Sequence, residues 1–178
     1  MEQAEKLETL RELRSGLDAL SQAIAGVDEQ MATRKPSREA WSILDCMDHM
    51  IQSERYLLTR LQAAVHADQP FEKSRREAKI AKLAADRSRR IEAPKEAHPR
   101  GNFRTLGEAL EAFHATRAEV VHWVANCTGD PRCMITDHPL IPGPVTCSET
   151  LIMIAAHPAR HAKQIEEIRS HNNTLPEN

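Results

Sequence analysis

Residues 42–61 read SILDCMDHMIQSERYLLTRL, and this stretch says most about the fold. Ser42 can serve as an N-cap, and Asp45, three positions later, completes the pattern of a capping box. Apolar side chains then recur every three or four residues, as they do on the buried face of a helix. These side chains are Ile43, Met47, Met50, Leu57 and Leu61. The stretch therefore predicts an amphipathic helix with bounds of about 43–66.

Three further segments show the same periodicity, over about residues 2–25, 106–126 and 147–171. Thr105 and Thr146 precede the last two of these segments, and each is followed three positions later by a glutamate, which again predicts a capping box. Aromatic residues make up only 3% of the chain, so a core must be built from aliphatic side chains, which favours helix-on-helix packing. The expected fold is all-α, a four-helix bundle.

Two long connections join these helices. Residues 67–104 hold a charged, partly helical stretch, Glu72–Arg90, and then a Pro- and Gly-containing approach to the third helix. Their composition does not support a second core, so we expect this segment to cross the outside of the bundle. Residues 127–145 form the second connection and are rich in Pro and Gly. The chain is therefore predicted to be a single domain, 1–178, long enough to bury a substantial core.

Charge and apolar content restrict the classes of function. The formal net charge is −2, so the chain has no basic field for nucleic acid. No apolar stretch reaches the length that crosses a bilayer. Residues Met1–Glu5 are acidic and unlike a signal peptide, and the four cysteines lack a tight zinc-type spacing and are expected to be reduced thiols. We expect a cytoplasmic protein, with neither nucleic acid nor a membrane as a partner.

Polar residues interrupt the apolar stripes of three predicted helices. Glu54 lies on the inward face of the second helix and Arg117 on that of the third, while His157 and His161 share the inward face of the fourth. A buried charge without a partner costs several kcal/mol, so these residues should contact one another or a ligand. Glu54 and Arg117 are open to two interpretations: a buried ion pair that fixes the helix register, or part of a polar pocket.

The spacing of His157 and His161 suggests a metal site. The two residues lie four apart on a predicted helix, so both rings project from one face and can share a divalent ion. His49 on the second helix is the natural third ligand, and Cys46 is either a fourth ligand or a small core residue. The alternative for the histidine pair is an incidental core or surface pair. Pro158 should kink the last helix between the two histidines.

Four short motifs follow one another along the chain. They are Trp41–Asp45 with His49, Met50 and Glu54; Ala93–Phe103 followed by Leu106–Arg117; His138–Leu140 with Gly143 and Pro144; and His157–Ile165. Together they resemble the DinB-like superfamily of metal-binding four-helix bundles, which is related to bacterial thiol-dependent S-transferases. The resemblance covers most of the chain. It implies an up-down-down-up bundle, with the long crossover between the second and third helices, and often a homodimer.

The resemblance also implies the site residues. The second-helix motif of that family supplies one metal histidine and the last-helix motif two, which correspond here to His49, His157 and His161. The expected metal is zinc, with nickel as the alternative. The residues expected beside a metal ligand or a substrate are Glu54, Arg117 and Gln164.

Three imidazoles leave an open position on a divalent ion, which lowers the pKa of a bound thiol or water. The function expected first is thiol S-transferase-like, in which a low-molecular-weight thiol attacks a small electrophilic substrate. Hydrolysis of a small amide or ester is the alternative reaction. Two further alternatives are a bundle that holds metal without turnover and a helical interaction module without metal.

Overall fold

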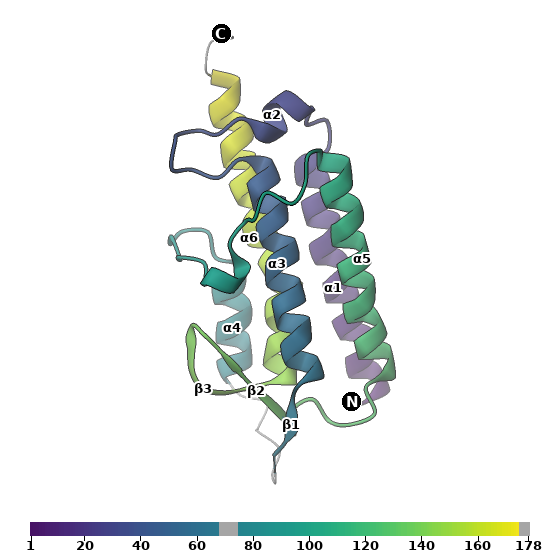
Figure 1. Cartoon of the computed structure of the whole chain (residues 1–178). Helices are drawn as coiled ribbons and strands as arrows, with labels where there is room; N and C mark the ends of the chain where they lie inside the picture. The colour runs from purple at the N-terminus through teal and green to yellow at the C-terminus, as the bar shows by residue number, and fades with distance from the viewer. Residues whose placement is uncertain (68–74, 175–178) are drawn as a thin grey trace.

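The computed structural model describes residues 1–67 and 75–174, and this part of the chain is mostly helical (Figure 1). The helices are α1 (Gln3–Ile24), α2 (Glu29–Thr33), α3 (Ile43–Gln62), α4 (Arg75–Ala85), the 3-10 helix η1 (Lys95–Ala97), α5 (Leu106–Asn126) and α6 (Cys147–Thr174). The four long helices, α1, α3, α5 and α6, lie side by side. In the view of Figure 1, α1 and α6 run upward and α3 and α5 run downward.

Side-chain caps begin three of the long helices, and the predicted capping box is complete at two of them, α3 and α6. At α5, the Thr105 hydroxyl accepts from the Glu108 N–H at 3.2 Å, but the Glu108 carboxylate accepts from the Arg104 N–H. The Ser42 hydroxyl accepts a hydrogen bond from the Asp45 N–H at 3.0 Å, and the Asp45 carboxylate accepts one from the Ser42 N–H at 2.9 Å. Thr146 and Glu149 make the same reciprocal pair at 3.1 and 2.9 Å. Because each box satisfies backbone donors that the helix itself leaves without partners, these sequences fix where α3 and α6 begin.

A small antiparallel sheet corrects the all-α prediction. It contains β1 (Val65–His66), β2 (Met134–His138) and β3 (Ile141–Thr146), in the order β1-β2-β3. Val65 and His66 were expected to end the second helix, but α3 stops earlier and these residues pair with β2. The second connection is thus a β-hairpin for much of its length. Among the described residues, no helix combines the length and apolar character of a membrane span.

Two short helices lie outside the four long ones. The sequence did not predict α2, in which Asp28 caps the first turn by accepting from the Met31 N–H at 2.7 Å. In contrast, α4 falls within the stretch expected to be partly helical, of which residues 72–74 lie outside the described residues. It packs against α6, where Arg160 donates to the carbonyls of Asp86 and Arg89 just beyond its end. The crossover therefore covers one side of α6.

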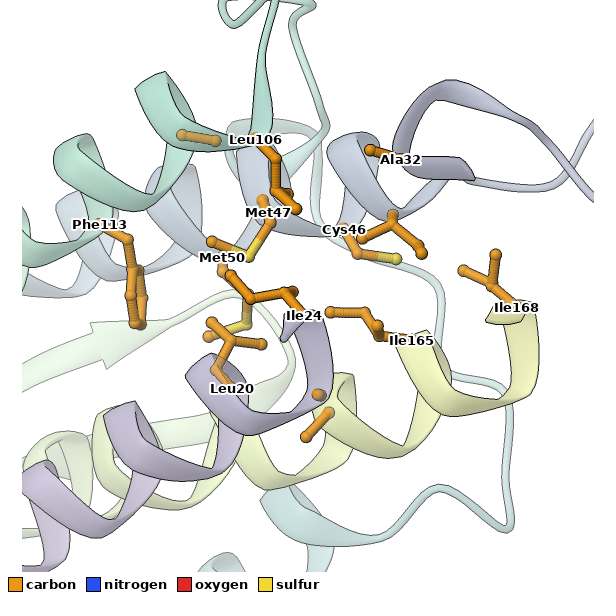
Figure 2. Close-up of a cluster of buried hydrophobic side chains, with 14 of the residues drawn as sticks. Leu20, Ile24, Ala32, Cys46, Met47, Met50, Leu106, Phe113, Ile165 and Ile168 are labelled. Atoms are coloured by element: carbon orange, nitrogen blue, oxygen red, sulfur yellow. The ribbon is translucent and has the colours of Figure 1, made fainter. Parts of the chain in front are cut away.

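Two apolar clusters fill the space between the long helices. The first, shown in Figure 2, includes Leu20, Ile24, Cys46, Met47, Met50, Phe113, Ile165 and Ile168. The second includes Leu13, Leu57, Leu61, Val120, Val124, Leu151 and Ile154. Along each helix, the polar residues of the interrupted stripes fall between the two clusters: Glu54 on α3, Arg117 on α5 and both histidines on α6. The molecule thus has a polar layer between two apolar cores.

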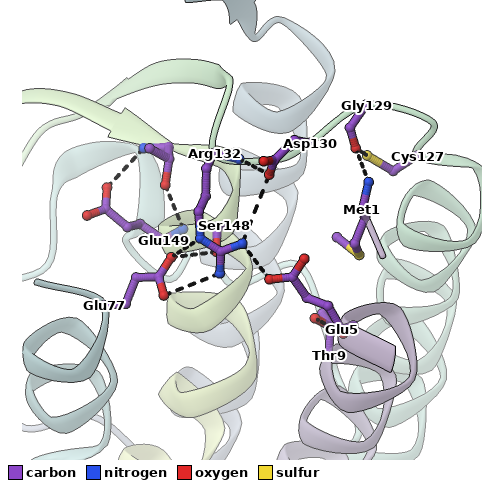
Figure 3. A network of polar contacts seen from close by, with 11 residues as sticks. Met1, Glu5, Thr9, Glu77, Cys127, Gly129, Asp130, Arg132, Ser148 and Glu149 are labelled. Carbon is purple, nitrogen blue, oxygen red and sulfur yellow. Dashed lines mark hydrogen bonds and ion pairs between the residues drawn. The ribbon is translucent and has the colours of Figure 1, made fainter. Parts of the chain in front are cut away.

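A polar network ties the lower end of the helices together (Figure 3). The Arg132 guanidinium forms ion pairs with Glu5 of α1 and with Glu77 of α4, the latter at 3.0 Å. The Glu77 carboxylate also accepts a hydrogen bond from the Ser148 hydroxyl of α6 at 2.9 Å. Three elements that are far apart in the sequence therefore meet on one guanidinium and one carboxylate.

Candidate metal centre

Three histidines from two helices converge at one point. One ring nitrogen from each of His49, His157 and His161 lies within 4.8 Å of the others. The Nε2 atoms of His157 and His161 are 2.9 Å apart, as their spacing of four on α6 suggests. The His49 ring, on α3, has its centroid 4.6 Å from that of His161 and 5.3 Å from that of His157. The structure thus brings together all three histidines selected from the sequence.

Burial keeps these rings neutral. His49 and His161 are each only 3% exposed, and His157 is partly exposed. Burial lowers the pKa of His49 to about 4. The pKa values of His157 and His161 lie well below their ordinary value, first because of burial and then because of neighbouring histidines and arginines. A neutral imidazole has a free lone pair, which is the form that binds metal.

The orientation of His49 is set by a backbone carbonyl. Its Nδ1 lies 2.6 Å from the Ala97 oxygen. Because a carbonyl oxygen can only accept a hydrogen bond, Nδ1 carries the proton and Nε2 keeps its lone pair. Trp41 packs against the same ring with the centroids 4.8 Å apart, and the Ser53 hydroxyl lies 3.5 Å from Nε2. This arrangement is typical of metal-binding histidines, whose second nitrogen donates to a fixed acceptor.

The cluster fits a divalent ion. Nitrogen ligands at about 2.0–2.1 Å from zinc are separated by about 3.3 Å in tetrahedral geometry and about 2.9 Å at right angles. The pair on α6 already has such a separation. The Nδ1 atom of His161 is buried and has no hydrogen-bond partner within the described residues. Three neutral donors without a carboxylate or thiolate suit zinc, nickel or another imidazole-binding transition metal.

The two predicted charges of the polar layer bind each other. Arg117 donates from Nε and Nη2 to the two Glu54 oxygens, each at 2.7 Å, and from Nη1 to the Leu13 carbonyl at 2.7 Å. Both side chains are at most 4% exposed. The structure therefore shows the buried ion pair of the first interpretation. Gln164 is half-buried on α6. Cys46 lies in the first apolar cluster (Figure 2) and is not part of the group of converging ring nitrogens.

Pro158 lies inside α6, which continues on both sides of it. A proline has no N–H, so the Ile154 carbonyl loses its usual helical donor. Arg117 supplies a replacement, because its Nη2 lies 3.3 Å from that carbonyl oxygen. The proline ring also packs against Gly16 of α1, where an added Cβ would come within 2.5 Å of the Ala155 oxygen. The proline between the two histidines is thus accommodated by an arginine from α5 and a glycine from α1.

Asp48, which directly precedes His49, is not among the residues predicted from the sequence. Its side chain is buried, at 2% exposed, and its Oδ2 accepts hydrogen bonds from the N–H groups of Arg100, Gly101 and Asn102 at 2.6, 2.8 and 3.3 Å. Its Oδ1 accepts from the Gln52 amide at 2.9 Å. The available signal was an acidic residue between Met47 and His49 on a largely buried helix.

Comparisons with known proteins identify the family of this chain. A family model described as the DinB superfamily matches residues 12–165, which include all three histidines. The uncharacterized protein YuaE of Bacillus subtilis (strain 168) is 24% identical over 164 residues, which cover 92% of each chain. Because the family model matches most of the sequence, the chain belongs to the DinB superfamily.

Proposed function

We propose that the four long helices form the four-helix bundle of this superfamily and that the protein binds a divalent metal ion through His49, His157 and His161. The observation that carries this proposal is the convergence of three ring nitrogens within 4.8 Å. Burial of neutral donors and the fixed tautomer of His49 support it further. Zinc is the ion expected first, and nickel is the alternative.

The proposed activity is the transfer of a small thiol to an electrophile. The bound ion would act as a Lewis acid that lowers the pKa of a thiol or water held at its open position. No cysteine or carboxylate of the described residues joins the histidine cluster, so this position is left for an external ligand. In the transfer, the thiol sulfur forms a bond to carbon, the leaving group departs with its electron pair, and the thiol proton passes to solvent. Trp41 packs on the His49 ring and so forms part of the surroundings of the cluster.

Elemental analysis of the purified, untagged protein tests the metal site. The wild type should contain near-stoichiometric zinc or nickel, and folded His49→Ala, His157→Ala and His161→Ala variants should lose it. His114→Ala, at an exposed position on α5, is the matched control and should keep it. A wild type that is metal-free and takes up no added zinc or nickel would contradict the proposal.

Removal of the metal separates an enzyme from a metal-storing or structural bundle. We expect the stripped protein to stay folded and to lose thiol consumption in the presence of a small alkylating electrophile, because a catalytic ion need not hold the fold. A structural ion should instead leave the protein unfolded when removed, which is more than the loss of ligand stabilisation that any bound ion provides. Small ester and amide substrates, assayed in parallel, test the hydrolase alternative. The small-molecule substrate, the cytoplasmic location and the homodimer stay predictions.

A further inference from the structure

The loop that holds His49 is itself held by the residue next to His49. We propose that Asp48 is a positioning residue of the metal centre: its carboxylate anchors residues 97–102 and so fixes the orientation and tautomer of His49. This inference rests on the proposed metal site and names a component that lies outside the three histidines.

Both oxygens of the Asp48 carboxylate accept hydrogen bonds, one from the loop and one from its own helix. Three consecutive backbone N–H groups, from residues 100–102, converge on one oxygen at 2.6 to 3.3 Å. Gln52, one turn further along α3, donates to the other oxygen at 2.9 Å. A buried carboxylate that accepts several hydrogen bonds from one loop holds those donors in place. Asp48 therefore has the contacts of an anchor.

The same loop returns to α3 at a second point. Ala97 ends η1 and is 3% exposed, and its carbonyl accepts the His49 Nδ1 proton at 2.6 Å. Two consecutive residues of one helix thus hold one loop, the first through its carboxylate and the second through its ring. The short segment between Ala97 and Arg100 links the two contacts, so the position of the Ala97 carbonyl depends on the hydrogen bonds that Asp48 accepts.

The effect of these loop contacts on His49 follows from the chemistry of imidazole. If the loop moved away, His49 would lose its acceptor and could place its proton on Nε2, where it would block the lone pair that a metal needs. Partners of this kind, one step removed from the ion, typically contribute 10- to 100-fold to metal affinity. Asp48 acts through the loop, so we expect an effect near the lower limit, about tenfold.

A glycine in the loop allows a test that leaves the core intact. Gly101 has a φ of +68°, and an added Cβ would meet no atom within 4 Å. Gly101→Val would therefore strain the anchored turn through its backbone alone, because β-branched residues rarely adopt this conformation. Gly26, with a φ of +73° and the same open surroundings, lies between α1 and α2 and provides a matched control.

The experiment compares Asp48→Asn and Gly101→Val with two controls, Glu77→Gln and Gly26→Val. Glu77 is also a buried carboxylate that accepts hydrogen bonds, but it belongs to the network at the lower end of the helices. Zinc affinity is measured by competition with a chelator, stability by urea unfolding, and the His49 tautomer by ¹⁵N NMR of the metal-free protein.

We expect both loop variants to bind zinc about tenfold more weakly and to show a mixed His49 tautomer. Both controls should lose stability with no change in zinc affinity beyond twofold. Unchanged affinity and tautomer in either folded loop variant would overturn the inference. If the wild type itself bound no zinc, the proposed metal site would fail, while the tautomer of the metal-free variants would still decide the role of Asp48.

Discussion

Two polar groups lie between the apolar cores, and they differ in how far their hydrogen-bonding capacity is used. In the Glu54–Arg117 pair, both carboxylate oxygens and all three guanidinium nitrogens have partners within the protein. In the histidine cluster, His161 keeps a buried nitrogen without a partner, and three ring nitrogens face one another. A polar group that is fully bonded holds structure, whereas one with converging lone pairs can hold a ligand.

Breaking the Glu54–Arg117 pair should have the largest effect on stability. Arg117→Met leaves the Glu54 carboxylate buried without its cation, which should lower the free energy of unfolding by about 3–5 kcal/mol. Urea unfolding measures this change. The double variant Glu54→Leu/Arg117→Met removes both charges and should recover part of the loss. A loss below about 1 kcal/mol in the single variant would contradict a structural role for the pair.

Acidification should act on the histidine cluster of the metal-free protein. The pKa of His49 is about 4 in the folded state, against an ordinary value of 6.5, because the ring is buried. The unfolded state therefore binds a proton first, so stability is full above about pH 6.5 and is lost as the pH falls toward 4. The shifted pKa of His49 alone should account for a loss of about 3 kcal/mol in the free energy of unfolding. Urea unfolding between pH 7.5 and 4.5 checks this, and His49→Gln should make the dependence shallower; an unchanged slope argues against it.

Added zinc should stabilise the folded protein through the histidine cluster and not through the Glu54–Arg117 pair. A ligand that binds only the folded state at 100 times its dissociation constant adds about 2.7 kcal/mol of stability. Thermal unfolding with and without zinc should therefore show a higher Tm for the wild type. The same addition should leave His161→Ala unchanged. Equal stabilisation of both proteins would place zinc elsewhere.

The smallest effect is expected at Cys46. This residue lies near His49 in the sequence, but its side chain belongs to the first apolar cluster. It is fully buried, and burial raises the pKa of its thiol, so a metal-binding thiolate is disfavoured. Cys46→Ala should cost about 1 kcal/mol through the small cavity that it leaves. Zinc affinity should stay the same. A marked loss of affinity would instead identify Cys46 as a fourth ligand.

The long helices could be predicted because their signals are local. Periodicity and caps act within a few residues, and the expected 106–126 agrees with Leu106–Asn126 as observed. The sheet was missed for the opposite reason. Its third strand, Ile141–Thr146, reads IPGPVT and holds residue types that are depleted in strands, and β1 pairs with residues far along the chain.

The candidate site shows the same division. His157 and His161 are neighbours by helical spacing alone, and the inward phase of Glu54 and Arg117 followed from the stripes. That these two charges bind each other, while the histidines form a separate cluster, depends on the packing of four helices and was left as an alternative. The contacts of Asp48 with the loop could not be predicted, since these three partners lie more than 50 positions away and offer only backbone N–H groups.

The close packing of α1 on α6 has a consequence for the order of folding. The first and last long helices contact each other along their length, and Arg169 donates to the Ala23 carbonyl across 146 positions. During synthesis, α1 emerges long before α6 and must keep its apolar face without that partner until α6 is made. Contacts so distant in sequence close late and slowly. The two α6 histidines arrive with that helix, so the histidine cluster is completed only when α6 packs on the core.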